Sequence, residues 1–195
     1  MKIVGISGKA QSGKSTLTEY LTEKYGYEEY SFAGPLKQIL LHLGFEHEEL
    51  YGTGQQKLVK NKHWGYSGRE AMQKIGTELF RESLPKILPK MERIWIRLFE
   101  IDCEEKGDKN YILSDIRRLD EADAIRKLGG VIIRTVKTVN DFNEKYRQHS
   151  SETEIDQIVP DFILDNDKNS IESARKTIDE YLGSIQEDRL GLKTI

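Results

Sequence analysis

Apolar residues gather in five short runs along the chain, and each run has the length and composition of a β-strand. These runs lie at residues 2–6, 27–32, 111–113, 131–136 and 161–165. Segments with apolar residues at helical spacing alternate with them and predict helices at residues 14–24, 36–43, 68–84, 90–105, 118–128 and 170–182. This alternation favours a parallel sheet with helices on both faces, because parallel strands need crossover connections. The pattern therefore predicts a single α/β doubly wound domain over residues 1–195, with a central parallel sheet of five strands.

Two long polar stretches interrupt this alternation. Residues 46–66 contain Gly52, Gly54 and Gly65 and show no clear period, so we interpret them as a mobile excursion. Residues 137–159 are charged and partly helical in pattern, and stretches of this length are usually functional lids or disordered. Residues 186–195 are expected to form a loosely held tail.

The composition excludes two broad classes of protein. No stretch approaches the roughly 18 consecutive apolar residues that a membrane span needs, so a membrane protein is not expected. Apolar segments recur throughout the 195 residues, and 30 basic residues nearly balance 33 acidic ones, which argues against a disordered chain. Cys103 is the only cysteine, so no internal disulfide can form, and no signal peptide precedes the first strand. We therefore expect a cytoplasmic protein.

Positive charge is concentrated in the middle of the chain. Residues 53–97 hold ten Lys and Arg against four Glu, a net charge of +6, which leaves −9 for the remainder of a chain whose net charge is −3. A basic segment within an acidic protein fits a small polyanionic ligand as well as it fits nucleic acid. The charge by itself does not distinguish a small polyanionic ligand from nucleic acid.

Residues 8–15 match the phosphate-binding pattern G-x-x-x-x-G-K-[ST], the P-loop, between the first strand and the first helix. Glycines let successive backbone N–H groups turn inward, and the helix N-terminus adds positive partial charge, so the loop predicts an anion cradle. Lys14 is expected to reach the β- and γ-phosphates of a triphosphate, and Ser15 to hold Mg²⁺. We expect ATP to be bound by Gly8, Ala10, Gln11, Ser12, Gly13, Lys14, Ser15 and Thr16.

Asp115 follows a buried strand and matches the position where a carboxylate holds Mg²⁺ or its waters. A strand-end carboxylate in a turn is the alternative interpretation. The guanine signature Asn-Lys-x-Asp does not occur in the sequence, which argues against a GTP-dependent switch. The short chain and its late charged segment favour a small P-loop kinase, with a non-catalytic nucleotide-binding module as the rival from another class.

The predicted helix after Ser67 carries a polar stripe. Arg69, Gln73 and Thr77 fall at i, i+4 and i+8, and a guanidinium, an amide and a hydroxyl in a row suit a phosphate and a base edge. An ordinary amphipathic helix with a solvated face is the alternative. Gly76 inside this helix costs about 1 kcal/mol relative to Ala, which indicates a close backbone or ligand approach.

Taken in order, these segments resemble the phage-type deoxynucleoside monophosphate kinases. The resemblance rests on the P-loop with Lys9, on 31–37, on Gly68-Arg69 with Gln73, Gly76, Thr77 and Arg81, on 115–118 with Glu121, on 149–152 and on 164–166. It implies transfer of the γ-phosphate of ATP, with Mg²⁺, to a deoxynucleoside monophosphate. It also implies a P-loop NTPase-type sandwich with a helical acceptor-binding region at about 35–106 and a lid at about 137–159. The phosphomevalonate kinases of animals share Pro-Leu-Lys and Asp-x-Arg-Arg, which keeps a non-nucleotide acceptor open.

The resemblance further implies roles for individual residues. Direct in-line transfer would use Lys14, Arg69, Arg117 and Arg118, with Ser15 and Asp115 as metal ligands. Arg147 and Asn166 would bind the donor nucleotide. The acceptor would be held by Lys9, Phe32, Ala33, Lys37, Arg69, Gln73, Thr77, Trp95 and Glu152. Trp95 has a second interpretation as a core residue, because its neighbours are apolar. No nucleic acid or membrane is an expected partner, a homodimer is left open, and a phage-encoded protein would act in the cytoplasm of its host.

Overall fold

The computed structural model describes residues 1–9, 11–138 and 150–189, without the side chains of 150–153 and 186–189. The chain divides into two compact units, one made of Met1–Glu29 and Asp108–Ile195 and the other of Tyr30–Gly107. We call the first the sheet unit and the second the helical unit. The helical unit covers nearly the same residues as the acceptor-binding region expected at about 35–106. Among the described helices, none combines the length and the apolar character needed to cross a membrane.

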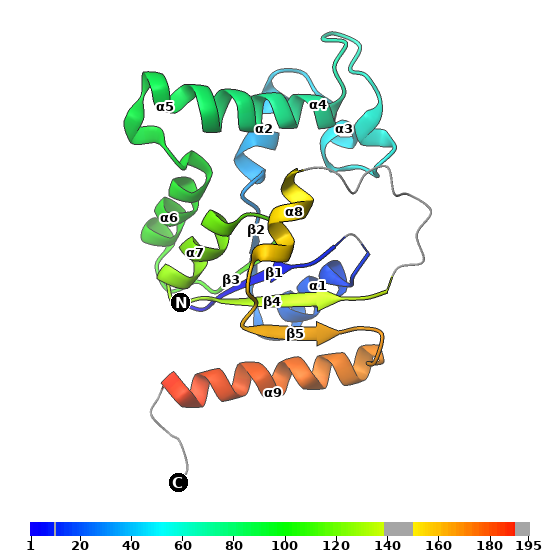
Figure 1. Cartoon of the computed structure of the whole chain (residues 1–195), viewed down its shortest axis with the longest axis vertical. Coiled ribbons are helices and arrows are strands. Elements are labelled where there is room, and N and C mark those ends of the chain that lie inside the picture. The colour runs from blue at the N-terminus through cyan, green and yellow to red at the C-terminus, as the bar shows by residue number, and fades with distance from the viewer. Residues whose placement is uncertain (10, 139–149, 190–195) are drawn as a thin grey trace. The chain divides into compact units, whose positions relative to one another are not determined.

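A sheet of five strands, in the order β2-β3-β1-β4-β5, forms the centre of the sheet unit (Figure 1). The strands are β1 Ile3–Ser7, β2 Glu28–Tyr30, β3 Tyr111–Ile116, β4 Val131–Val136 and β5 Phe162–Asp165. β1 pairs in parallel with β3 and β4, and β4 pairs in parallel with β5. The predicted α/β doubly wound fold is confirmed.

Helices cover both faces of this sheet, which explains why β1 is buried along its whole length. The helices of the sheet unit are α1 Lys14–Tyr25, α7 Leu119–Lys127, α8 Ser150–Gln157 and α9 Ile171–Arg189. α1 and α9 share one apolar cluster with the sheet, in which Leu21 and Ile178 are fully buried. On the other face α7 contacts β1 and β4, and α8 contacts α7.

Parallel pairing brings the carboxyl ends of the paired strands to one edge of the sheet. The loop after β1, the end of β3, the end of β4 and the residues after β5 therefore meet there, and ligands of open α/β sheets bind at such an edge. This is the edge that holds the P-loop and Asp115.

The helical unit consists of helical segments of 3 to 13 residues joined by turns and loops. They are α2 Gly34–His42, α3 His47–Tyr51, η1 Gln56–Leu58, α4 Gly68–Gln73, η2 Lys74–Ser83, α5 Leu84–Ile87, η3 Pro89–Met91 and α6 Ile94–Lys106. η1 and η3 are 3₁₀ turns, and η2 is a π-helix. Leu36 and Leu40 of α2 are buried, as are Ile96 and Phe99 of α6.

Residues 46–66, expected to form a mobile excursion, include regular structure, and their mobility stays a prediction. The segment contains α3, which begins at a capping box formed by Glu46 and Glu49. The Glu49 carboxylate is buried and also accepts a hydrogen bond of 2.8 Å from the Asn61 side chain, while Leu50 is fully buried. The order comes from these polar pairings, which leave no hydrophobic period to read.

Two predicted helix boundaries also need correction. The helix expected at 68–84 is α-helical only to Gln73 and continues as the π-helix η2, in which hydrogen bonds run from i to i+5. Thr77 therefore does not follow Arg69 and Gln73 at α-helical spacing. The last helix extends to Arg189, so residues 186–189 belong to α9 and not to the expected tail.

Candidate functional site

The P-loop connects β1 to α1 through backbone that only glycine adopts easily. Gly8 has a φ of 146° and Gly13 a φ of 99°, and a Cβ on Gly8 would lie 2.5 Å from the Thr135 carbonyl oxygen. Gln11 also takes a positive φ, 63°. The Ser12 N–H donates to the Lys9 carbonyl at 3.3 Å, which closes the loop before α1 begins. The result is the concave turn at a helix N-terminus that favours anions.

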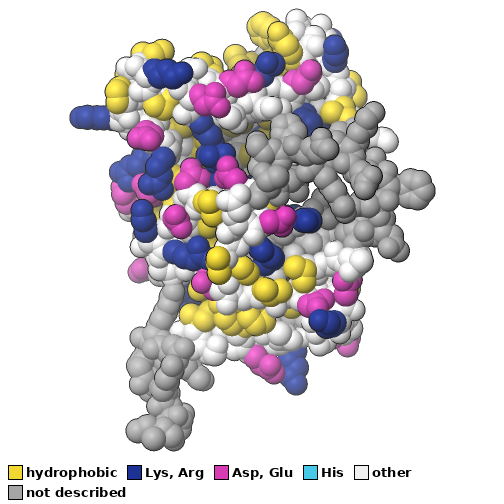
Figure 2. All heavy atoms as spheres, in the orientation of Figure 1, with side chains coloured by type: hydrophobic (Ala, Val, Ile, Leu, Met, Phe, Trp, Pro, Cys, Tyr) yellow, Lys and Arg dark blue, Asp and Glu magenta, His cyan; other side chains and the backbone are white. Residues whose placement is uncertain are grey.

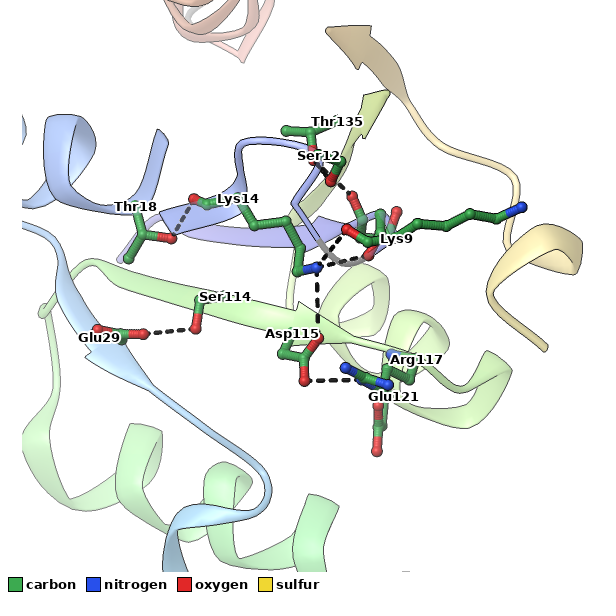
Figure 3. A network of polar contacts seen from close by, with 12 residues as sticks. Lys9, Ser12, Lys14, Thr18, Glu29, Ser114, Asp115, Arg117, Glu121 and Thr135 are labelled. Carbon is green, nitrogen blue, oxygen red and sulfur yellow. Dashed lines mark hydrogen bonds and ion pairs between the residues drawn. The ribbon is translucent and has the colours of Figure 1, made fainter. Parts of the chain in front are cut away.

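The Lys14 ammonium group lies at the centre of this loop (Figure 3). It donates to the carbonyl oxygens of Gly8, at 2.7 Å, and Lys9, at 3.0 Å. It is also 4.0 Å from the Asp115 carboxylate at the end of β3. Lys14 is therefore held where a phosphate in the loop would meet it. The structure thus brings two predicted site residues, Lys14 of the P-loop and Asp115 of β3, close together.

Two arginines, Arg117 and Arg118, follow Asp115 at this edge of the sheet. Arg117 donates through Nε to the Asp115 carboxylate at 2.8 Å. Arg118 Nη1 lies 3.5 Å from Glu154 of α8. The buried Glu121 accepts from the backbone N–H groups of both arginines, which fixes the turn after β3. The sequence singled out Glu121 only as part of the resemblance, and the structure gives it this bracing contact.

Lys9, at the outer side of the P-loop, lies 3.7 Å from Asp156 of α8. Both side chains are exposed, and exposed pairs of this kind contribute little to stability. α8 itself is held at its C-terminus by Arg134 of β4, which donates to the carbonyl oxygens of Ile155 and Ile158. The acidic side chains of α8 thus lie beside two of the cations that the sequence assigns to phosphates, Lys9 and Arg118.

A cavity of about 320 Å³ opens beside the P-loop in the sheet unit. Its walls include Gly13, Thr16, Tyr20, Asn166, Asn169 and Arg175. The cavity is lined by α1, which follows the P-loop, and by residues that follow β5. Its lining is partly apolar and partly polar, as is usual for a small-molecule site. A second cavity, of about 430 Å³, is lined by Ile3, Asn110 and Val131 at strand beginnings and contains none of the predicted site residues.

Apart from Lys9 and Glu152, the predicted acceptor residues belong to the helical unit. Arg69 is exposed in the first turn of α4, and Lys37 of α2 lies 4.3 Å from the centre of the Tyr51 ring. α2 and α4 contact each other, so the elements that carry Lys37 and Arg69 are neighbours. Gln73 is exposed at the end of α4, and Thr77 is half-buried in η2.

Two aromatic residues predicted near the acceptor are buried within the helical unit. Phe32 packs edge-on against Phe99, with ring centres 5.7 Å apart. Trp95 is 4% exposed, and its indole N–H donates to the Gly76 carbonyl oxygen at 3.2 Å. The environment of Trp95 matches the second interpretation, a core residue. Ala33 forms the N-cap of α2, and its acceptor role stays a prediction like that of Phe32.

Some predicted site residues lie outside the described residues. These are Ala10, Arg147, the Glu152 side chain and positions 139–149 of the expected lid. Thr135 is a residue at this edge that the sequence did not indicate, and its hydroxyl lies 2.7 Å from that of Ser12. It belongs to no motif and reaches the P-loop because β4 pairs with β1 in the sheet.

Comparison with known proteins places the chain in a family. The deoxynucleotide monophosphate kinase family matches residues 44–178, more than half of the chain. The chain belongs to the deoxynucleotide monophosphate kinase family. A protein of Acanthamoeba polyphaga mimivirus that carries this name provisionally is 33% identical over 95% of this chain and 94% of its own length.

More distant likenesses agree with this family and with the fold. The deoxynucleotide monophosphate kinase of Enterobacteria phage T4 is 21% identical over 86% of this chain and 93% of its own length. The crystal structure of TT1252 from Thermus thermophilus is 16% identical over 93% of this chain and 96% of that chain, with a TM-score of 0.52. That likeness concerns the fold alone.

Proposed function

We propose that this member of the deoxynucleotide monophosphate kinase family transfers the γ-phosphate of ATP to a deoxynucleoside monophosphate in the presence of Mg²⁺. The observation that carries the proposal is the P-loop, with Lys14 between the loop carbonyls and Asp115. A phosphate entering the loop would take the Lys14 ammonium from neutral carbonyl oxygens, and a hydrogen bond between two oppositely charged groups is the stronger one. The cavity bounded by Tyr20, Asn166 and Arg175 has room for the donor base beside that loop.

The donor set at this edge fits magnesium. Mg²⁺ prefers hard oxygen ligands and is usually held by one or two carboxylates together with substrate phosphates. Ser15 offers a hydroxyl in the first turn of α1, and Asp115 offers a carboxylate at the end of β3. The bound ion would offset negative charge on the donor phosphates. Asp115 would then exchange its contact with Lys14 for the ion.

The remaining residues supply positioning and charge. Arg117 and Arg118 would stabilise the charge that develops on the transferred phosphoryl group, a role that suits planar guanidinium donors. Lys9, Lys37 and Arg69 would hold the acceptor phosphate. The acceptor oxygen is ionised at neutral pH, so direct in-line transfer needs no strong general base.

An assay of coupled ADP release tests this function. The protein is incubated with ATP, Mg²⁺ and each nucleoside and deoxynucleoside monophosphate in turn, with mevalonate phosphate as a non-nucleotide acceptor. We expect ADP and a nucleoside diphosphate in equal amounts with at least one deoxynucleotide. Transfer to mevalonate phosphate alone, or ADP release that no acceptor increases, would contradict the proposal.

A further inference from the structure

Ser12 of the P-loop is held by one residue on β4 and by another in the turn after β5. Its buried hydroxyl lies 2.7 Å from the Thr135 hydroxyl on β4. Its carbonyl oxygen accepts a hydrogen bond of 2.7 Å from the side-chain amide of Asn166, which follows β5. The Asn166 backbone N–H in turn donates to the Val136 carbonyl at 2.9 Å, so the amide projects from a fixed point of the sheet.

The contact with Asn166 determines how the next peptide group is oriented. The Ser12 carbonyl and the Gly13 N–H belong to one planar peptide unit, and none of the described peptide bonds is cis. Fixing the direction of the carbonyl therefore fixes the direction of the N–H. In a P-loop such backbone N–H groups bind the phosphates, so the orientation of Gly13 bears directly on the cradle.

Gly13 and Asn166 also fit closely against each other. A Cβ on Gly13 would lie 2.5 Å from the Asn166 amide nitrogen, and the φ of 99° at Gly13 is unfavourable for any other residue. The amide can pack against the loop backbone only because that position has no side chain. The glycine of the motif and Asn166 therefore form one local arrangement.

Asn166 contacts more than the phosphate loop. It lines the cavity of about 320 Å³ that also borders Tyr20 and Arg175. The Asn166 side chain thus lines the cavity proposed for the donor base and also supports the P-loop. Contact with a base alone would not require the hydrogen bond to Ser12.

We propose that Asn166 is a positioning residue, which holds the Ser12–Gly13 peptide so that the Gly13 N–H points at the donor phosphates. The proposal rests on the proposed function for its reaction, and it adds a role in catalysis to a residue expected only to bind the nucleotide. Because oriented donors act most strongly where charge develops, loss of this support lowers kcat as well as donor affinity.

The test compares Asn166→Ala with Asn110→Ala. Asn110 precedes β3, its side-chain oxygen accepts a hydrogen bond of 2.8 Å from the Lys2 N–H, and it lines the cavity of about 430 Å³ that contains no predicted site residue. With ATP varied at saturating acceptor, we expect Asn166→Ala to lower kcat by about ten- to a hundredfold, less than the roughly 10²–10³ caused by deleting a donor. Asn110→Ala is expected to keep both kcat and the KM for ATP within about threefold.

Asn166→Asp provides a second variant of nearly unchanged shape. It replaces the amide donor by a carboxylate oxygen facing the Ser12 carbonyl, so we expect a loss of kcat at least as large as that of Asn166→Ala. Thermal unfolding identifies any variant that fails to fold. If both variants raise the KM for ATP and leave kcat unchanged, Asn166 contacts the base only and the proposal is wrong.

Binding of inorganic tripolyphosphate, measured by calorimetry, separates this inference from the proposed function. The ligand has no base and needs no acceptor, so it reports on the cradle alone. We expect Asn166→Ala to weaken its binding by about tenfold and Asn110→Ala to leave it unchanged. A wild-type protein that binds tripolyphosphate but phosphorylates no acceptor would refute the proposed function and leave the cradle test valid. Equal tripolyphosphate binding by wild type and Asn166→Ala would refute the positioning role.

Discussion

The candidate site of the sheet unit consists mainly of backbone groups, whereas that of the helical unit consists of side chains. In the sheet unit the phosphate cradle is made of backbone, with Gly8 and Gly13 at positive φ and bracing side chains from neighbouring strands. In the helical unit the candidate acceptor residues are side chains on short helices, such as Lys37 and Arg69, and several are exposed. A backbone site tolerates almost no change of residue at its glycines, whereas a side-chain site can change its specificity by substitution. This difference suits a constant donor and a variable acceptor.

The basic residues of the middle segment lie among acidic ones. On the face of the molecule shown in Figure 2, Lys and Arg side chains are intermixed with Asp and Glu. Within the helical unit Lys74 pairs with Glu78, and Arg97 pairs with Glu100 and Glu104. Glu78 is already counted in the net charge of +6, whereas Glu100 and Glu104 lie outside residues 53–97, so of these pairs only those of Arg97 offset the excess.

The largest expected effect belongs to the cradle. Lys14→Ala removes the ammonium group that would follow the charge on the transferred phosphate, and we expect kcat to fall by about a thousandfold. Coupled ADP release measures the loss. Lys176→Ala is the matched control, since that lysine is exposed on α9 and pairs only weakly with Glu180. Turnover of Lys14→Ala near that of the control would contradict the P-loop assignment.

Backbone dependence is tested at two glycines. Gly8→Ala places a Cβ 2.5 Å from the Thr135 carbonyl, so we expect loss of activity and a fall in the free energy of unfolding of about 3 kcal/mol. Gly26→Ala is the control, because Gly26 also has a positive φ, 65°, but a Cβ there meets nothing within 4 Å. It should cost only about 1–2 kcal/mol. Denaturant unfolding of both variants measures the difference, and equal losses would show that crowding at Gly8 is unimportant.

The side-chain site should respond more selectively. Arg69→Ala is expected to raise the KM for the acceptor by about tenfold or more while the KM for ATP changes little, since a guanidinium–phosphate contact contributes about 1.5–3 kcal/mol. Steady-state kinetics with each substrate varied measures the split. Lys74→Ala is the control from the same helical stretch, exposed and paired with Glu78. A change in both KM values would mean that Arg69 does not serve the acceptor alone.

The helix that carries Arg69 depends on its cap. Ser67 accepts from the Glu70 N–H at 3.2 Å, and Glu70 accepts from the Ser67 N–H at 2.8 Å, so Ser67→Ala should lower the free energy of unfolding by about 1 kcal/mol. The hydrogen bonds from the Ser67 backbone and hydroxyl lower the pKa of Glu70.

A carboxyl group whose pKa is lowered in the folded state stabilises the protein at pH values above the ordinary pKa of glutamate. This stabilisation is lost as the pH falls through the lowered pKa. We therefore expect the stability difference between wild type and Glu70→Gln to shrink between pH 7 and strongly acid pH. Denaturant titrations across that range measure it. A difference that is independent of pH would contradict the capping role of Glu70.

The smallest effect is expected at Cys103 on α6. Burial raises the pKa of its thiol to about 11, with the nearby carboxylates of Asp102, Glu100 and Glu104 adding to the shift. The folded protein should react slowly with a thiol reagent at pH 8 and should react at the ordinary rate in denaturant. Absorbance after addition of an aromatic disulfide follows the reaction, and rapid modification of the folded chain would show that the helical unit opens readily.

Much of the sheet unit is visible in the sequence, because a strand, a glycine loop and a helix are local patterns. The P-loop at 8–15 needs no distant residue to be recognised, and Asp115 follows from the end of a buried strand. The helical unit is less readable. α3 depends on the pairing of Glu49 with Asn61, twelve residues apart, and the π-helix η2 replaces the α-helix that the spacing of Arg69, Gln73 and Thr77 indicated.

The sequence by itself therefore determined the class of fold, the phosphate loop and the family that the chain resembles. Only the tertiary structure decided which residues support the loop, because Thr135 and Asn166 lie more than a hundred positions from Ser12 and meet it through strand pairing. It also decided that Trp95 is buried and that Lys14 rests on loop carbonyls and Asp115. Local periodicity records which face of an element is apolar, whereas contacts between elements depend on the order of strands in the sheet.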